Sequence, residues 1–249
     1  MGYSVEMFLI GVDYSAQKGK VGLACGRLDG DSLKVEFAKC PETHAAVEQQ
    51  IVDWINKEKK NGGVLLAIDA PLGWPEPLSK VLCRHKAGRA LSTPADQMFK
   101  RATDRWVRDE IGQNPLEVGA NLIARTAYSA LSFLLKLRNE TGYAIPLAWN
   151  PGRAKGVSVI EVYPAATLKG RNPLSKTTED IIKKLKEEIT LCGDTEEQMR
   201  GSKDVRDAVV CVLAAADFAN KNNKVISPKE AKVDLKLAKK EGWIWVKKS

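Results

Sequence analysis

The chain has 249 residues, of which 44% are hydrophobic and 28% are charged, a profile that is ordinary for a globular protein with a sizeable core. The N-terminus has no basic leader, no apolar run approaches a membrane span, and the five dispersed cysteines form no Cys-x-x-Cys pair, so we expect a cytoplasmic protein with free thiols. The net charge of +8 favours a polyanionic partner, and with only two histidines a histidine-rich metal site is excluded, which leaves carboxylates as the main chemical resource.

The N-terminal segment predicts three strands. Residues 7–13 form a short apolar run that ends in Asp13, as a buried central strand does. Residues 20–26 give a second strand, and residues 32–38 alternate apolar and polar side chains like a half-exposed strand. The links between these segments are short and carry turn residues, so we expect an antiparallel meander.

A helix and a fourth strand follow. Thr43 can cap a helix over 44–60, and the Asn-Gly-Gly at 61–63 ends it. The next strand, 64–70, repeats the first in design, with Asp69 at the end of its apolar run. A crossover helix returns the chain for a parallel strand, which gives the order βββαβ.

The rest of the chain predicts further helices and strands. We expect one domain over 1–249, in which a helical insertion, broken by prolines, occupies about 71–156. The later elements are a helix at 115–140, a strand at 158–163, an amphipathic helical stretch at 176–200, a buried helix at 203–220 and an edge strand at 242–246.

Two aspartates end apolar strands. Asp13 and Asp69 fall at carboxyl ends of strands, where ligands usually bind in α/β proteins. A charged group seldom lies there without a hydrogen-bonding partner or a metal ion. For either residue alone, the cap of a turn is the simpler interpretation. Together they favour a common site.

The late helix brings two more carboxylates. Asp204 and Asp207 are three residues apart and share a helix face. Complementation of the helix dipole explains Asp204 easily but Asp207 less well. Four such carboxylates repel one another, and Mg²⁺ or Mn²⁺ relieves that repulsion. Two such ions about 4 Å apart can hydrolyse a phosphodiester. The alternative is that the aspartates pair with arginines, for which the candidates are Arg101, Arg105 and Arg206.

An ordered set of motifs spans nearly the whole chain: Gly11-Val-Asp13, Ile68-Asp-Ala-Pro-Leu72, Arg101-Ala-Thr-Asp104, Glu161-Val-Tyr-Pro164 and Asp204-x-x-Asp207-Ala. The arrangement resembles the ribonuclease H-like superfamily, particularly its Holliday-junction-resolvase branch. More closely, it resembles domain-of-unknown-function family 429, usually labelled a predicted nuclease. The resemblance implies a mixed five-stranded sheet flanked by helices.

The same resemblance implies roles for individual residues. Asp13, Asp69 and Asp207 are the expected metal ligands, with Asp204 as a fourth. Glu161 either joins this catalytic group or has a structural role, and the sequence favours neither. The implied activity is that of a metal-dependent nuclease.

Basic residues supply candidate contacts to nucleic acid. The segment 80–108 interleaves cations with Phe99 and Trp106, as a groove that contacts phosphates and stacks bases does. A solvated helix with its aromatic side chains packed inward explains the same pattern. The candidate substrate-binding residues are Lys18, Lys20, Arg84, Arg89, Arg101 and Arg105.

Two other functions fit parts of the pattern. A non-catalytic nucleic-acid-binding module can share a nuclease-like fold, although it has no need of all four carboxylates. An actin-like ATP-dependent kinase shares the strand order, but the chain has neither a second such domain nor a Gly/Thr-rich phosphate loop. The oligomeric state stays open, with a dimer among the possibilities.

Overall fold

The computed structural model describes residues 6–17, 19–60, 62–171 (the backbone alone at 121), 177–220, 222 and 225–247. Its elements are, in chain order, β1 Met7–Asp13, β2 Gly22–Asp29, β3 Ser32–Lys39, α1 His44–Glu58, β4 Val64–Asp69, α2 Glu76–Leu82, α3 Ala95–Phe99, α4 Ala102–Trp106, the π-helix η1 Val107–Ile111, α5 Asn121–Thr141, β5 Val157–Glu161, α6 Pro164–Lys169, α7 Thr178–Glu188, β6 Ile189–Leu191, α8 Thr195–Gly201, α9 Lys203–Ala219 and α10 Leu235–Glu241.

A mixed sheet in the order β5-β4-β1-β2-β3-β6 forms the centre of the fold. Strands β1, β2 and β3 make an antiparallel meander. After α1 crosses over, β4 pairs with β1 in parallel, and β5 pairs with β4 in the same direction. This is the predicted βββαβ order and confirms the ribonuclease H-like α/β fold.

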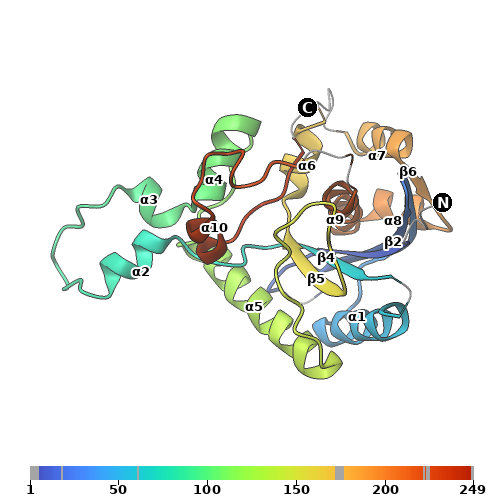
Figure 1. Cartoon of the computed structure of the whole chain (residues 1–249), viewed down its shortest axis with the longest axis horizontal. Helices are drawn as coiled ribbons and strands as arrows, with labels where there is room; N and C mark the ends of the chain where they lie inside the picture. Colours follow the sequence, from blue (N-terminus) through green and yellow to red (C-terminus); the bar gives the residue numbers. More distant parts are fainter. Residues whose placement is uncertain are drawn as a thin grey trace.

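Helices cover both faces of the sheet. In Figure 1, α1 and α5 lie on one face, while α9 lies on the other with α6, α7 and α8 beside it. Thr43 caps α1, as predicted, by accepting a hydrogen bond from the Ala46 N–H at 3.1 Å. The buried stripe Val47, Ile51 and Ile55 then faces the sheet. No helix in the described part of the chain has both the length and the apolar character needed to cross a membrane.

Helix α9 lies against the sheet because two strand residues lack side chains. A Cβ atom on Gly11 of β1 would lie 2.1 Å from the Ala208 carbonyl oxygen, and one on Gly22 of β2 would lie 1.9 Å from that of Asp204. Both distances are shorter than any real Cβ contact, so only glycine permits this approach. The helix interior is almost entirely buried, in agreement with its predicted apolar character.

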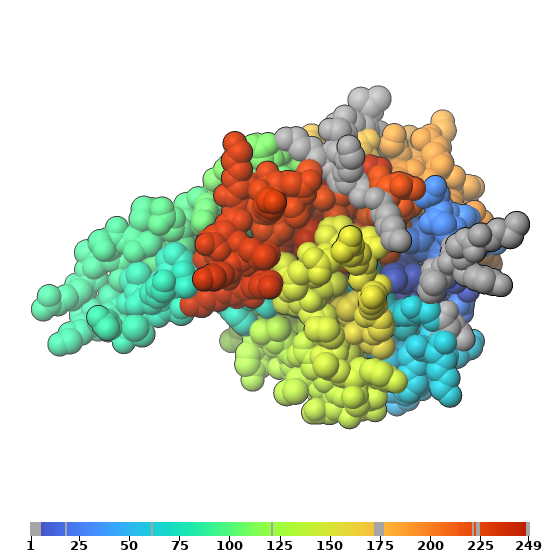
Figure 2. Space-filling model, viewed as in Figure 1, coloured from blue at the N-terminus to red at the C-terminus, as the bar shows by residue number. Residues whose placement is uncertain are grey.

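The segment between β4 and β5, for which the sequence predicted a helical insertion, contains α2, α3, α4, η1 and α5. Figures 1 and 2 show that α2, α3 and the loop between them project from the body as an arm. The helix expected at 115–140 is α5, which begins at Asn121.

Two details of the predicted sheet were wrong. The sheet has six strands instead of five, because β6 pairs in parallel with the edge strand β3. The stretch 176–200, predicted as helical, is therefore α7, then β6, then α8. A strand of three residues is too short to show an alternating pattern within a charged helical stretch.

The stretch 242–246 is not the predicted edge strand and forms only an isolated bridge between Ile244 and Glu161. Its side chains are buried on both sides of the chain, with Trp243 and Trp245 each 2% exposed. The Ile244 N–H donates to the Thr103 hydroxyl at 2.9 Å and the Trp245 N–H to the Glu161 carbonyl at 3.0 Å. The N–H groups of Ile244 and Trp245 are thus bonded to one side chain and one main-chain carbonyl from different elements, and not to a neighbouring strand throughout.

We predict that Gly11→Ala and Gly22→Ala each lower the free energy of unfolding by about 3 kcal/mol or more, because the added methyl group forces α9 away from the sheet. Urea denaturation followed by circular dichroism measures the change. Gly201→Ala is the matched control, since nothing lies within 4 Å of a Cβ atom there. Equal stability of the three variants would contradict this close packing.

Candidate metal centre

Asp13 and Asp69 lie side by side at the carboxyl ends of two parallel strands. They are register partners in the β1–β4 pair, and neighbouring strands lie about 4.8 Å apart. Leu9 and Leu65, each four residues earlier, pack in the core cluster beneath α9. Side chains four apart on a strand share a face, so both carboxylates point toward α9.

The first turn of α9 brings Asp204 and Asp207 to the same place. The Ser202 hydroxyl caps this helix by accepting from the Val205 N–H. Gly22, over which the Asp204 backbone lies, is also the antiparallel partner of Asp13. The glycine contact therefore fixes the start of α9 beside the ends of β1 and β4. The structure brings together all four aspartates that the sequence singled out.

The aspartates at this site repel one another electrostatically. Burial, reinforced by the negative charges of Asp207 and Asp204, raises the pKa of Asp13 to about 7. Burial, followed by the charges of Asp13 and Asp207, raises the pKa of Asp69 well above its ordinary value. Among the described residues, no basic side chain forms an ion pair with Asp13 or Asp69.

Lys203 is a cation at this site that was not among the residues predicted from the sequence. Its exposed Nζ lies 3.3 Å from the Asp207 Oδ2. The pKa of Asp207 is raised by burial, and Lys203 opposes that rise. Asp207 increases the pKa of Lys203 in return. The i,i+4 spacing of the two residues on α9 was a signal that could have indicated this pair.

The donor set suits a hard divalent cation. Carboxylate oxygens are the ligands that Mg²⁺ and Mn²⁺ prefer, and the strand register already places two of them next to each other. In the described part of the chain, no three His, Cys, Asp or Glu side chains lie close enough as they stand to hold an ion.

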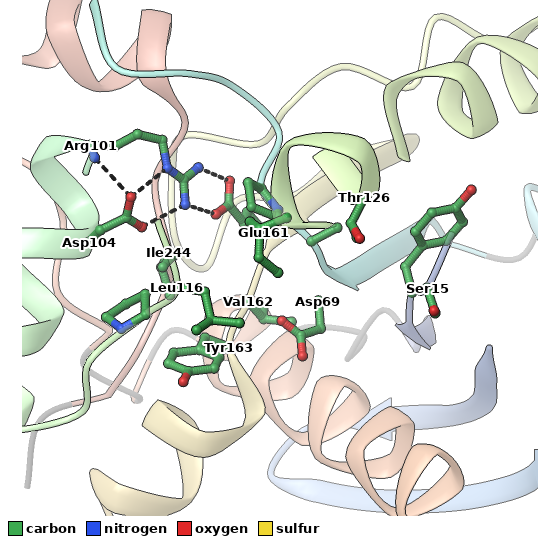
Figure 3. A pocket seen from close by; sticks show the side chains of 15 residues that line it. Ser15, Asp69, Arg101, Asp104, Leu116, Thr126, Glu161, Val162, Tyr163 and Ile244 are labelled. Carbon is green, nitrogen blue, oxygen red and sulfur yellow. Dashed lines mark hydrogen bonds and ion pairs between the residues drawn. The ribbon is translucent and has the colours of Figure 1, made fainter. Parts of the chain in front are cut away.

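Glu161 lies near this group but is held on the other side of its strand. Ile160 and Val162 pack in the core cluster with α9, so Glu161 between them faces away from that helix. Its Oε1 accepts from Arg101 Nη2 at 2.6 Å, and its Oε2 accepts from Arg101 Nη1 at 2.9 Å and from the Leu72 N–H at 3.0 Å. Both oxygens are engaged within the protein, as Figure 3 shows for the arginine.

Arg101 is 1% exposed, and all five of its N–H donors are used. Besides the two bonds to Glu161, it donates two to the Asp104 carboxylate, at 2.8 and 3.0 Å, and one to the Glu241 carbonyl at 3.2 Å. No donor remains for a phosphate. This buried network joins α4 of the insertion to β5 and to the end of α10, and removing one partner from such a network costs about 3–5 kcal/mol.

The basic cluster at 80–108 divides into two parts. Arg84 and Arg89 are exposed on the arm and form no ion pair among the described residues. Arg105 instead donates to the Lys100 carbonyl at 2.6 Å, and Trp106 packs on Trp243 with ring centroids 5.6 Å apart. Trp106 therefore packs inward, as the alternative interpretation of this segment predicted.

Two lysines, Lys18 and Lys20, were predicted to lie near Asp13. Lys20 is exposed and lies two residues before Gly22, the antiparallel partner of Asp13, so it lies at the same end of the sheet. Lys18 lies outside the described residues.

Fold and site together define an α/β protein of the ribonuclease H-like class with a carboxylate cluster at the strand ends. The chain belongs to the family described as protein of unknown function (DUF429), which matches residues 11–232. The sequence matches no curated protein significantly. Among solved structures, the chain is similar to T. thermophilus RuvC in complex with a Holliday junction substrate, with 10% identity, a TM-score of 0.38, and coverage of 83% of this chain and 90% of that one.

The raised pKa of Asp13 gives a prediction for the metal-free protein. Burial raises the pKa of this carboxyl to about 7 in the folded protein, against 3.8 in the unfolded chain, so between these values only the folded state holds the proton. The stability that results is fully present below about pH 4 and is lost as the pH rises through about 7.

Asp13→Asn cannot ionise, so in chelator it should lose about 2 kcal/mol less stability than the wild type between about pH 5 and pH 8. Urea titrations at the two pH values measure this difference. Asp53→Asn, on the exposed side of α1, should follow the wild type. Parallel curves for Asp13→Asn and the wild type would contradict the shift.

Proposed function

We propose that this protein is a metal-dependent hydrolase of phosphodiester bonds in nucleic acid. The observation that carries the proposal is the register pairing of Asp13 with Asp69, under Asp204 and Asp207, with no cationic partner for the first two among the described residues. Nearly buried carboxylates without a direct ion-pair partner raise the energy of the folded protein, so their presence at one sheet end favours a functional role.

Each aspartate has a distinct place in the proposed site. Asp13 and Asp69 hold the ions from the sheet, Asp207 completes the set from α9, and Asp204 is the fourth ligand. When bound, Mg²⁺ or Mn²⁺ supplies a nucleophilic hydroxide and stabilises the leaving oxygen. Lys203, freed from its pairing with Asp207, offers its ammonium group to a phosphate oxygen.

Glu161 has a structural role in this proposal, because both of its oxygens are already engaged with Arg101 and Leu72. Arg101 is left out of substrate binding for the same reason. The proposed phosphate contacts beyond the metal centre are the exposed residues Lys20, Arg84 and Arg89. Lys18 stays a sequence-based prediction.

We predict that Asp13→Asn, Asp69→Asn and Asp207→Asn each reduce cleavage by at least about a hundredfold, because a cluster of ligands acts as a unit. The assay measures Mn²⁺-supported cleavage of single-stranded, double-stranded and branched DNA and RNA, with calorimetric Mn²⁺ titration of each variant. Asp53→Asn is the matched control.

Wild-type cleavage that persists in all three variants would reject the carboxylate site. Absence of both cleavage and Mn²⁺ binding in the wild type, with nucleic-acid binding retained, would instead favour the non-catalytic binding module.

The arm gives a separate prediction. Reversing Arg84 and Arg89 to glutamate should weaken nucleic-acid binding and lower the slope of log affinity against log salt by about 1.5, because two phosphate contacts are lost. Fluorescence anisotropy at several salt concentrations measures the slope. Reversal of the exposed Lys57 and Lys183, on α1 and α7, makes the same charge change elsewhere. An equal effect of both double reversals would show only a general influence of net charge.

A further inference from the structure

A cavity of about 290 Å³ opens beside Asp69, and the proposed hydrolysis makes no use of it. Figure 3 shows Asp69 among the lining side chains, with Tyr163 and Leu116 on one side and Ser15 and Thr126 on the other. The walls come from the ends of β1, β4 and β5 and from the insertion. The cavity therefore lies between the candidate metal centre and the segment that connects β4 to β5.

Much of the wall is apolar or aromatic, and its rings are held in place. The Tyr14 hydroxyl is bonded to the Ser129 hydroxyl at 2.7 Å, and its ring packs on Phe133 with centroids 5.2 Å apart. The Tyr163 hydroxyl accepts from Gln113 at 3.4 Å. Rings fixed in this way offer flat surfaces to a ligand without further loss of side-chain freedom.

The charges along the cavity oppose a phosphate inside it. Three carboxylates line it, those of Asp69, Asp104 and Glu161, against a single guanidinium, that of Arg101. All five donors of this guanidinium are used within the protein. A neutral, flat group suits this environment, whereas an anionic group is favoured only at the Asp69 end, where cations can bind.

The volume sets the size of that group. Ligand pockets usually have about 300–1,000 Å³, so this cavity lies at the lower end of the range. It accommodates a single nucleobase or nucleoside, while a base pair within a continuous duplex is too large. Enzymes that act on nucleic acid place extruded bases in pockets of this kind, stacked on aromatic and apolar side chains.

We propose that this cavity binds one unpaired nucleobase of the strand whose phosphate lies at Asp69. The substrate class is then single-stranded or locally unpaired nucleic acid. The inference rests on the proposed function, because it takes the aspartate cluster as the place of the phosphate. Base binding itself needs neither the metal ion nor cleavage, so the two proposals can fail separately.

The test measures binding of the four neutral deoxynucleosides to the full chain in chelator by saturation-transfer NMR, with affinities from titration. Ile123→Trp fills the cavity from α5, and Tyr163→Leu removes an aromatic face while keeping apolar bulk. Leu135→Trp, at a side chain of the same helix that is 56% exposed, is the matched control. Thermal melts establish that each variant is folded.

We expect the wild type and Leu135→Trp to bind at least one nucleoside, and the two cavity variants to bind it at least about tenfold more weakly. Failure of the wild type to bind all four nucleosides, or wild-type affinity in a folded Ile123→Trp, would overturn the base pocket. Mn²⁺ binding and cleavage without nucleoside binding would leave the hydrolase standing and remove the pocket. Nucleoside binding without Mn²⁺ binding would do the reverse.

Discussion

The contact between α9 and the glycines of the first two strands is the constraint on which the site depends. Gly11 and Gly22 let the backbone of α9 approach to distances that no other residue permits. Because Gly22 is paired with Asp13, the same contact decides that the first turn of α9 lies over the strand ends. The aspartates of that turn then reach Asp13 and Asp69, although they follow Asp13 by about 190 residues and Asp69 by about 135. The same helix–sheet packing that builds the core therefore also brings the carboxylates together.

Two groups of acidic side chains occupy the same end of the sheet, and they differ in how their charge is balanced. Glu161 and Asp104 share the guanidinium of Arg101 in a buried network whose donors and acceptors are satisfied. Asp13 and Asp69 have no such partner in the described chain, and burial raises the pKa of both. The first arrangement stabilises the fold and locks the insertion to β5. The second destabilises it, as functional sites commonly do.

Sequence reasoning reached the strands and the aspartates because each is encoded locally. The apolar runs that end in Asp13 and Asp69 show their strand character and their position at once, and a helix presents Asp204 and Asp207 on one face by its period alone. Contacts between residues that are far apart in the sequence could not be predicted. Nothing near Arg101 in the sequence indicates that its guanidinium will pair with Glu161, 60 residues later. The burial of Arg101 was therefore not predictable. The pairing of β6 with β3 and the burial of Trp243 and Trp245 depend likewise on neighbours that only the fold supplies.

The central claim is that the aspartates of β1, β4 and α9 together hold divalent cations. Anomalous diffraction from crystals soaked in Mn²⁺ tests it most directly, because it locates the ion without requiring turnover. We expect anomalous peaks bonded to Asp13 and Asp69, with Asp207 or Asp204 as a further ligand and with carboxylate oxygens about 2.0–2.2 Å from the ion. Well-ordered crystals that bind Mn²⁺ elsewhere, with the aspartate cluster empty and its side chains unmoved, would contradict it.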